Sequence, residues 1–114
     1  MIVTKSWIVQ YIKEKPAELA KAMVGRALWR LWRRQTADEQ QDKRTKHRNA
    51  RGFNAFDAVP GSYAGQYYAK HGTITNQMFK EWTAPRGRGG YPKICRYTRQ
   101  LNEIALEVGK SKET

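Results

Sequence analysis

Apolar side chains recur every three or four residues through most of this chain, and no segment alternates apolar and polar residues as a half-buried strand does. The clearest case is a spacing near the end of the chain, formed by Ile94, Tyr97, Leu101, Ile104 and Val108. At about 3.6 residues per turn these positions share one face of a helix. A length of 114 residues fits one domain. We therefore predict an all-α protein, a single compact helical domain of about five helices with long ordered loops.

Caps and helix-breaking residues predict where these helices begin and end. Thr4 suits an N-cap, so residues 1–15 are expected to form an N-terminal helical arm. Pro16 suits the first turn of a second helix. Gly72 is expected to end a helix over residues 62–71, and Gly109 to end the final one. The main domain is thus predicted to span residues 16–109, followed by a disordered tail over residues 110–114.

Two segments between the predicted helices differ in their content of apolar and basic residues. The stretch GFNAFDAVPGS has turn residues together with Phe53, Phe56 and Val59, so we expect an ordered loop anchored on the core by these three side chains. The run over residues 43–51 contains almost nothing to bury and is strongly basic. It is predicted to be an exposed linker.

The balance of charge is the strongest indication of function. The chain has 22 lysines and arginines against 10 acidic residues, for a formal net charge of +12. A chain this cationic repels itself at neutral pH, and binding to a polyanion is the commonest reason for such an excess. We therefore expect a nucleic acid as partner.

The cations fall into groups that predict two contacts with phosphates. The second helix and the linker would supply the first contact, through Arg26, Arg30, Arg33, Arg34, Lys43, Arg44, Lys46, Arg48 and Arg51. The Arg-Gly loop and the start of the last helix would supply the second, through Arg86, Arg88, Lys93, Arg96 and Arg99. Specificity stays open, because no set of residues is identified that would read base edges.

Trp29 lies among the arginines of the second helix and is a candidate for stacking on a base or sugar. The opposing interpretation is that Trp29 and Trp32 both belong to the core and that the arginines form a solvated face, paired with acidic residues. The sequence leaves these two interpretations in balance.

The residues that usually carry catalysis or bind metals do not form recognised patterns. Cys95, His47 and His71 are too widely separated for a zinc site, and RGRGGYPK lacks the order of a phosphate-binding loop of the Walker type. Four acidic residues could in principle hold a metal for a nuclease, namely Asp38, Glu39, Asp42 and Asp57, but the first three stand near a predicted helix start, where the helix dipole favours acids. We predict no enzyme activity, no cofactor and no metal.

Localisation follows from hydropathy and cysteine content. The longest apolar run is too short to cross a membrane, and polar residues interrupt the N-terminal segment where a signal peptide would stay apolar. The single cysteine, Cys95, cannot form an intramolecular disulfide, which suits a reducing compartment. We therefore expect a cytoplasmic protein without membrane association.

Four strings of the sequence, ALWRLWRRQTADEQ, GFNAFDAVPGS, GTITNQMFKEW and KICRYTRQLNEIA, together resemble a small helical module of bacteriophage and plasmid proteins that is sometimes appended to helicase-like proteins. The resemblance covers about residues 27–105. It implies a mobile-element origin, a bacterial host cell and a nucleic-acid context, and it supplies no catalytic residue.

These observations together predict a small basic phage-type accessory protein that binds nucleic acid through phosphates, with DNA favoured over RNA. One alternative is a phage counter-defence inhibitor that binds a host nuclease or CRISPR complex. A second alternative is a structural subunit of a ribonucleoprotein, in which the aromatic residues are core and the cations neutralise RNA. The oligomeric state is not predicted.

Overall fold

The structure is a computed structural model, and it describes residues 3–34, 53, 56–86 and 89–113. These residues form the α-helices α1 (Lys5–Glu14), α2 (Ala17–Arg34), α4 (Ala58–His71), α5 (Asn76–Thr83) and α6 (Thr98–Glu113). They also form a 3₁₀ helix, η1 (Lys93–Tyr97), and two short strands, β1 (Pro85–Arg86) and β2 (Tyr91–Pro92). The prediction of an all-α single domain is confirmed. The predicted basic linker over residues 43–51 lies outside the described residues.

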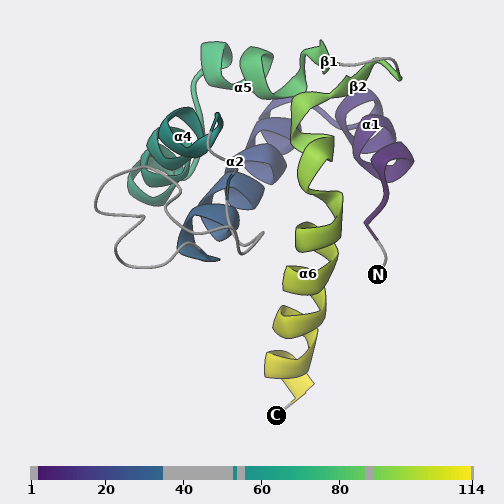
Figure 1. Cartoon of the computed structure of the whole chain (residues 1–114), viewed down its shortest axis with the longest axis vertical. Helices are drawn as coiled ribbons and strands as arrows, with labels where there is room; N and C mark the ends of the chain where they lie inside the picture. Colours follow the sequence, from purple (N-terminus) through teal and green to yellow (C-terminus); the bar gives the residue numbers. More distant parts are fainter. Residues whose placement is uncertain (1–2, 35–52, 54–55, 87–88, 114) are drawn as a thin grey trace.

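The elements surround one apolar core. Figure 1 shows α1 and α4 at opposite sides of the molecule with α2 between them, α5 across the top, and α6 running downward from the body. Leu28 and Leu31 of α2 are buried in the core, as are Ile8 of α1 and Ile94 of η1. None of the described helices combines the length and apolar character needed to cross a bilayer.

The N-terminal residues belong to this core rather than to a separate arm. Thr4 caps α1 through its side chain, which accepts a hydrogen bond from the Trp7 amide. Val3 is buried, and its amide and carbonyl groups both bond to the side chain of Asn102 in α6. The first and last helices of the chain are therefore joined directly.

Helix α4 begins earlier than predicted. It begins at Ala58 instead of Ser62, because Pro60 falls in the first turn, where the backbone needs no N–H donor. Of the three predicted anchors only Phe53 is buried. Phe56 is 90% exposed and Val59 is also exposed, so the prediction was wrong for both. Phe53 instead packs against Trp82 and Tyr97, with ring centroids 5.7 and 5.6 Å away.

The predicted final helix is divided and longer than expected. Residues Lys93–Tyr97 form η1, and α6 follows from Thr98. Helix α6 continues through Gly109 to Glu113, so the predicted end at Gly109 is wrong. Glycine inside a helix costs only about 1 kcal/mol relative to alanine, which other residues of a helix can offset. Residues 110–113, predicted as part of a disordered tail, lie in this helix.

Between α5 and η1 the chain makes a small hairpin. Pro85 pairs with Pro92 and Arg86 with Tyr91 in antiparallel register. Gly90 has a positive φ of 65°, a conformation that glycine adopts without steric penalty. Helical structure ends at Thr83, and each strand has only 2 residues, so the hairpin leaves no alternating pattern in the sequence.

Helices α2 and α4 approach each other closely at glycines. A Cβ atom built at Gly65 of α4 would lie 3.0 Å from the Leu28 carbonyl oxygen and 3.0 Å from Trp32 Cβ, both in α2. A Cβ at Gly25 of α2 would lie 2.5 Å from Tyr68 Cδ2 in α4. Gly25 thus faces Tyr68 while Leu28 faces Gly65, which means that the two helices run antiparallel.

We expect Gly65→Val to lower the free energy of unfolding by roughly 1–3 kcal/mol, because the new side chain overpacks the contact between α2 and α4. Ala69→Val is the matched control, since Ala69 lies on the same helix but is exposed. The control is expected to lose no more than about 0.7 kcal/mol of helix propensity. Urea denaturation followed by tryptophan fluorescence measures both. Equal losses in the two variants would show that this helix contact is not tight.

Candidate nucleic-acid interface

Two arginines of α2 lie at one indole ring, and a third lies one turn earlier on the helix. The Cζ atoms of Arg30 and Arg33 lie 4.8 and 5.1 Å from the centroid of the Trp29 ring. Arg26 lies one turn earlier on the same helix and is exposed, as is Arg33. The 3.6-residue period places all of these side chains on the side of α2 that faces away from the core.

Helix α4 extends this group with a tyrosine. Arg26 Nε donates a hydrogen bond to Tyr68 Oη at 3.5 Å, and this bond raises the pKa of the Arg26 guanidinium above its ordinary value. The ring of Tyr68 lies 6.4 Å from that of Trp29. The Trp29 surface is therefore a composite of two helices, formed by Arg26, Trp29, Arg30, Arg33 and Tyr68.

The arginines of the Trp29 surface differ from other cations of the protein in their partners. Among the residues that the structure describes, Arg26, Arg30 and Arg33 form no ion pair with a carboxylate. Helix α4 contributes no acidic side chain, and α2 contributes only Glu18 in its first turn. The positive charge of this surface is thus not neutralised by those helices.

Arg34 has a different position from the other arginines of α2. Its guanidinium donates to Glu103 Oε2 at 2.8 Å and to the Gln100 carbonyl oxygen at 3.3 Å, and its side chain is only 11% exposed. Arg34 was predicted as a phosphate ligand together with its neighbours. The structure places it in the contact between α2 and α6, where it is already bound to a carboxylate.

The predicted second contact gathers around acidic side chains. Lys93 Nζ lies 3.3 Å from Asp57 Oδ1, and Arg96 Nη1 lies 3.2 Å from Asp57 Oδ2. Arg99, which is 93% exposed, is 3.7 Å from Glu103. The side chains of Arg86 and Arg88 lie outside the described residues, as do the linker cations Lys43, Arg44, Lys46, Arg48 and Arg51.

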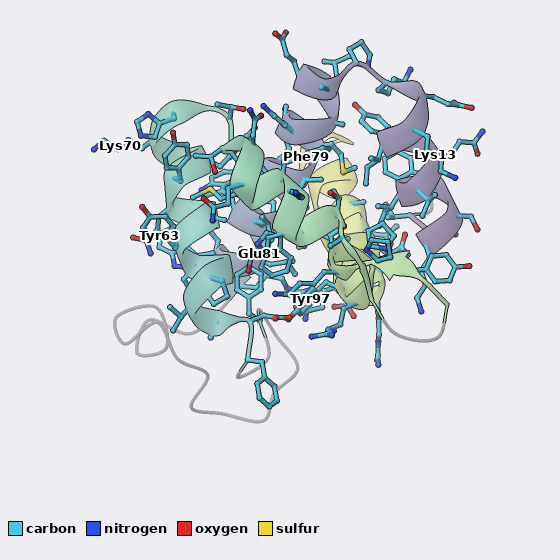
Figure 2. The ribbon with its side chains drawn as sticks, turned by 90° about the horizontal axis from the view of Figure 1, so that it is seen from above. Lys13, Tyr63, Lys70, Phe79, Glu81 and Tyr97 are labelled. Carbon is cyan, nitrogen blue, oxygen red and sulfur yellow. The ribbon has the colours of Figure 1, made fainter. Side chains whose placement is uncertain are left out.

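Asp57 connects α4 to η1. It occupies the N-cap position of α4 without capping it, and its carboxylate instead accepts a hydrogen bond from Tyr97 Oη at 2.5 Å. Lys93 reaches it across the face of Trp82, 4.5 Å from the ring centroid, and also approaches Glu81 at 3.6 Å. Figure 2 shows Glu81 and Tyr97 on this part of the molecule, between α5 and the start of α6.

This ionic cluster is the main feature that sequence reasoning missed. From the sequence, Asp57 was named only as a candidate metal ligand. In the structure its carboxylate is surrounded by Lys93, Arg96 and the hydroxyl group of Tyr97. No three metal-ligating side chains of the His, Cys, Asp and Glu types meet within the described ranges. The three-residue spacing of Lys93 and Arg96 was visible, but nothing in the sequence indicates which acid they share.

Tyr68 was also missed as a partner of the arginines. Its distance from Arg26 in the sequence is 42 residues, and only the antiparallel contact of α2 with α4 brings the two together. His71, at the end of α4, packs against Tyr67 with ring centroids 4.2 Å apart. The backbone of Gly72 caps the helix, through its N–H bond to the Tyr68 carbonyl oxygen.

Comparison of this chain with protein-family models, with curated proteins and with solved structures finds no match.

We expect Asp57→Ala to lower the free energy of unfolding by about 3 kcal/mol or more, since Asp57 is 2% exposed and its removal leaves Lys93 without its closest partner. Glu81→Ala is the control. Its side chain is partly exposed and Lys93 keeps Asp57, so a loss of less than about 1 kcal/mol is expected. Urea denaturation measures both. If Asp57→Ala lowered the free energy of unfolding no more than the control does, the cluster would not have the structural role assigned to it.

We expect the Cys95 thiol to react slowly in the native protein. It is buried, and desolvation raises its pKa, an effect that nearby Lys5 only partly opposes. At a given pH below the pKa, each unit of increase lowers the thiolate fraction about tenfold. Since the thiolate is the reactive form and burial also limits access to the sulfur, a disulfide exchange reagent at pH 8 should react more slowly with the native protein than after unfolding in guanidinium chloride. Equal reaction rates in the native and the unfolded protein would show that the Cys95 thiol is not buried.

Proposed function

We propose that this protein binds nucleic acid and that the Trp29 surface holds the phosphates. The observation that carries this proposal is the difference between two groups of cations. Arg34, Lys93, Arg96 and Arg99 each lie within 4 Å of a carboxylate, whereas Arg26, Arg30 and Arg33 have no such partner among the described residues. Unneutralised guanidinium groups that share one surface attract polyanions and release their counterions on binding.

The position of the guanidinium groups at an aromatic ring suits phosphate binding. A cation stacked on an aromatic ring uses its face for that contact, so the N–H donors at its edge stay available. Two such donors can hold two oxygens of one phosphate. Arg30 and Arg33 both lie at the Trp29 ring and carry the same charge, so they repel each other, and a phosphate that contacts both relieves this repulsion.

The biological context of the proposal comes from the resemblance to the phage and plasmid module. It supports a small phage-type accessory protein that acts on the nucleic acid of a bacterial cell. The inhibitor and ribonucleoprotein alternatives use the same cationic surface, so the test has to distinguish binding to naked nucleic acid from binding to a protein.

We expect Arg30→Glu with Arg33→Glu to weaken binding to nucleic acid by at least about tenfold in 50 mM salt, while the thermal melt stays close to that of the wild type. If each of these two arginines contacts one phosphate, the slope of log affinity against log salt should fall by about 1.4–1.8, or 0.7–0.9 per phosphate. Gel-shift titrations with duplex DNA, single-stranded DNA and RNA at two salt concentrations measure both effects.

The control matches the change of charge at two exposed lysines on other helices, Lys13→Glu with Lys80→Glu. Figure 2 shows Lys13 on α1, far from α4. An equal loss of affinity in the control would mean that net charge alone drives binding, against the proposed surface. A protein partner retained from nuclease-treated host lysate, together with no binding to any naked strand, would overturn the proposal in favour of the inhibitor.

A further inference from the structure

Aromatic side chains continue from the Trp29 surface around α4. Tyr67 and His71 form a ring pair with centroids 4.2 Å apart, at an angle of 39°. Tyr63 lies one turn before Tyr67 and is 60% exposed. Figure 2 shows Tyr63 and Lys70 projecting from the outer side of α4, at the edge of the molecule opposite to Lys13. We name Tyr63, Tyr67 and His71 the α4 aromatic row.

The row lies on the same helix as Tyr68, the α4 residue of the Trp29 surface. On a helical wheel, steps of about 100° per residue place Tyr68 on the side of α4 that faces α2, and place His71, Tyr67 and Tyr63 progressively further toward solvent. Tyr68 itself contacts both Arg26 and Trp29. Tyr68 therefore connects the two groups: its ring contacts the arginines' side of α2, and the row leads from it around α4 to the outer face of that helix.

The composition of α4 identifies the kind of occupant. The helix has no acidic residue, and Lys70 adds a cation beside the row. A partner that covers this surface must carry negative charge for the arginines and flat apolar groups for the rings. Nucleic acid has both, because each nucleotide along the strand carries one phosphate and one flat base.

The strand must be single for the bases to reach the rings. In a duplex the bases stack on each other and the phosphates face outward, so exposed tyrosines gain little from contact with it. In a single strand each base offers a free face to an aromatic side chain. Residues four apart on a helix lie about 6 Å from each other, a separation that neighbouring unstacked bases can match.

We infer that the physiological ligand class is single-stranded nucleic acid, with phosphates on the Trp29 surface and bases stacked on the α4 aromatic row. This inference rests on the proposed function, since it names the ligand class of the same surface. DNA and RNA share the chemistry that the row recognises, so both are probes in the test.

The test measures fluorescence anisotropy of labelled 15-nucleotide probes with the full chain: oligo-dT, oligo-rU, an abasic DNA strand and a DNA duplex of equal length. We expect oligo-dT and oligo-rU to bind more tightly than the abasic strand and the duplex. Tyr63→Ala with Tyr67→Ala should weaken binding to oligo-dT or oligo-rU by about 30-fold, and binding to the abasic strand by less than about twofold. Whichever of oligo-dT and oligo-rU binds more tightly identifies the preferred strand.

The conservative variant separates stacking from other roles of these side chains. Tyr63→Phe with Tyr67→Phe keeps both rings and should retain nearly the affinity of the wild type, whereas loss of binding in this variant would assign the effect to the hydroxyl groups and overturn stacking. Thermal melts check that all variants fold, which is expected because Tyr63 is exposed and Tyr67 only partly buried.

Two outcomes distinguish failure of this inference from failure of the proposed function. If the duplex binds as tightly as the single strands, or if the alanine variant binds like the wild type, the inference is overturned. The proposed function then still stands provided that Arg30→Glu with Arg33→Glu weakens binding. If no probe binds in 50 mM salt, the proposed function fails, and this inference fails with it.

Discussion

The close contact between α2 and α4 is the constraint on which the rest of the molecule depends. Gly65 lets the backbone of α4 approach the Leu28 carbonyl group and Trp32, and Gly25 leaves room for the ring of Tyr68. This approach covers Leu28 and Leu31 in the core and at the same time sets Tyr68 beside Trp29 and Arg26. A helix pair held further apart would separate the aromatic residues that define the candidate interface.

Charge is divided unevenly over the surface as a result of this packing. Asp57, at the start of α4, and Glu81 of α5 pair with Lys93 and Arg96 of η1. Glu103 of α6 pairs with Arg34 and Arg99. The side formed by the outer faces of α2 and α4 carries arginines without described carboxylate partners. An ion pair between exposed side chains adds little to the free energy of folding. The lack of carboxylate partners therefore costs the protein little stability, and the main cost is the repulsion of the arginines for one another.

Local patterns in the sequence were sufficient for the helices but not for the site. Thr4, Gly72 and Thr75 act at helix ends as their residue types predict, and the all-α class follows from the three- and four-residue spacing. The partners of Arg26 and Arg34 lie 42 and 69 residues away, and no local rule relates them. Phe56 and Val59 show a further limit, because hydrophobic character alone does not reveal that a helix begins early and turns both side chains outward.

The hydrogen bonds between Val3 and Asn102 affect the order in which the protein folds. They join residues separated by 99 positions, and the Sγ of Cys95 approaches the Lys5 carbonyl oxygen in the same region. Closing so long a loop is entropically costly and slows folding relative to a bundle stabilised by neighbouring helices. Helix α6 must therefore be synthesised and free to pack before α1 reaches its final position, so the N-terminal part of the core is completed late in folding.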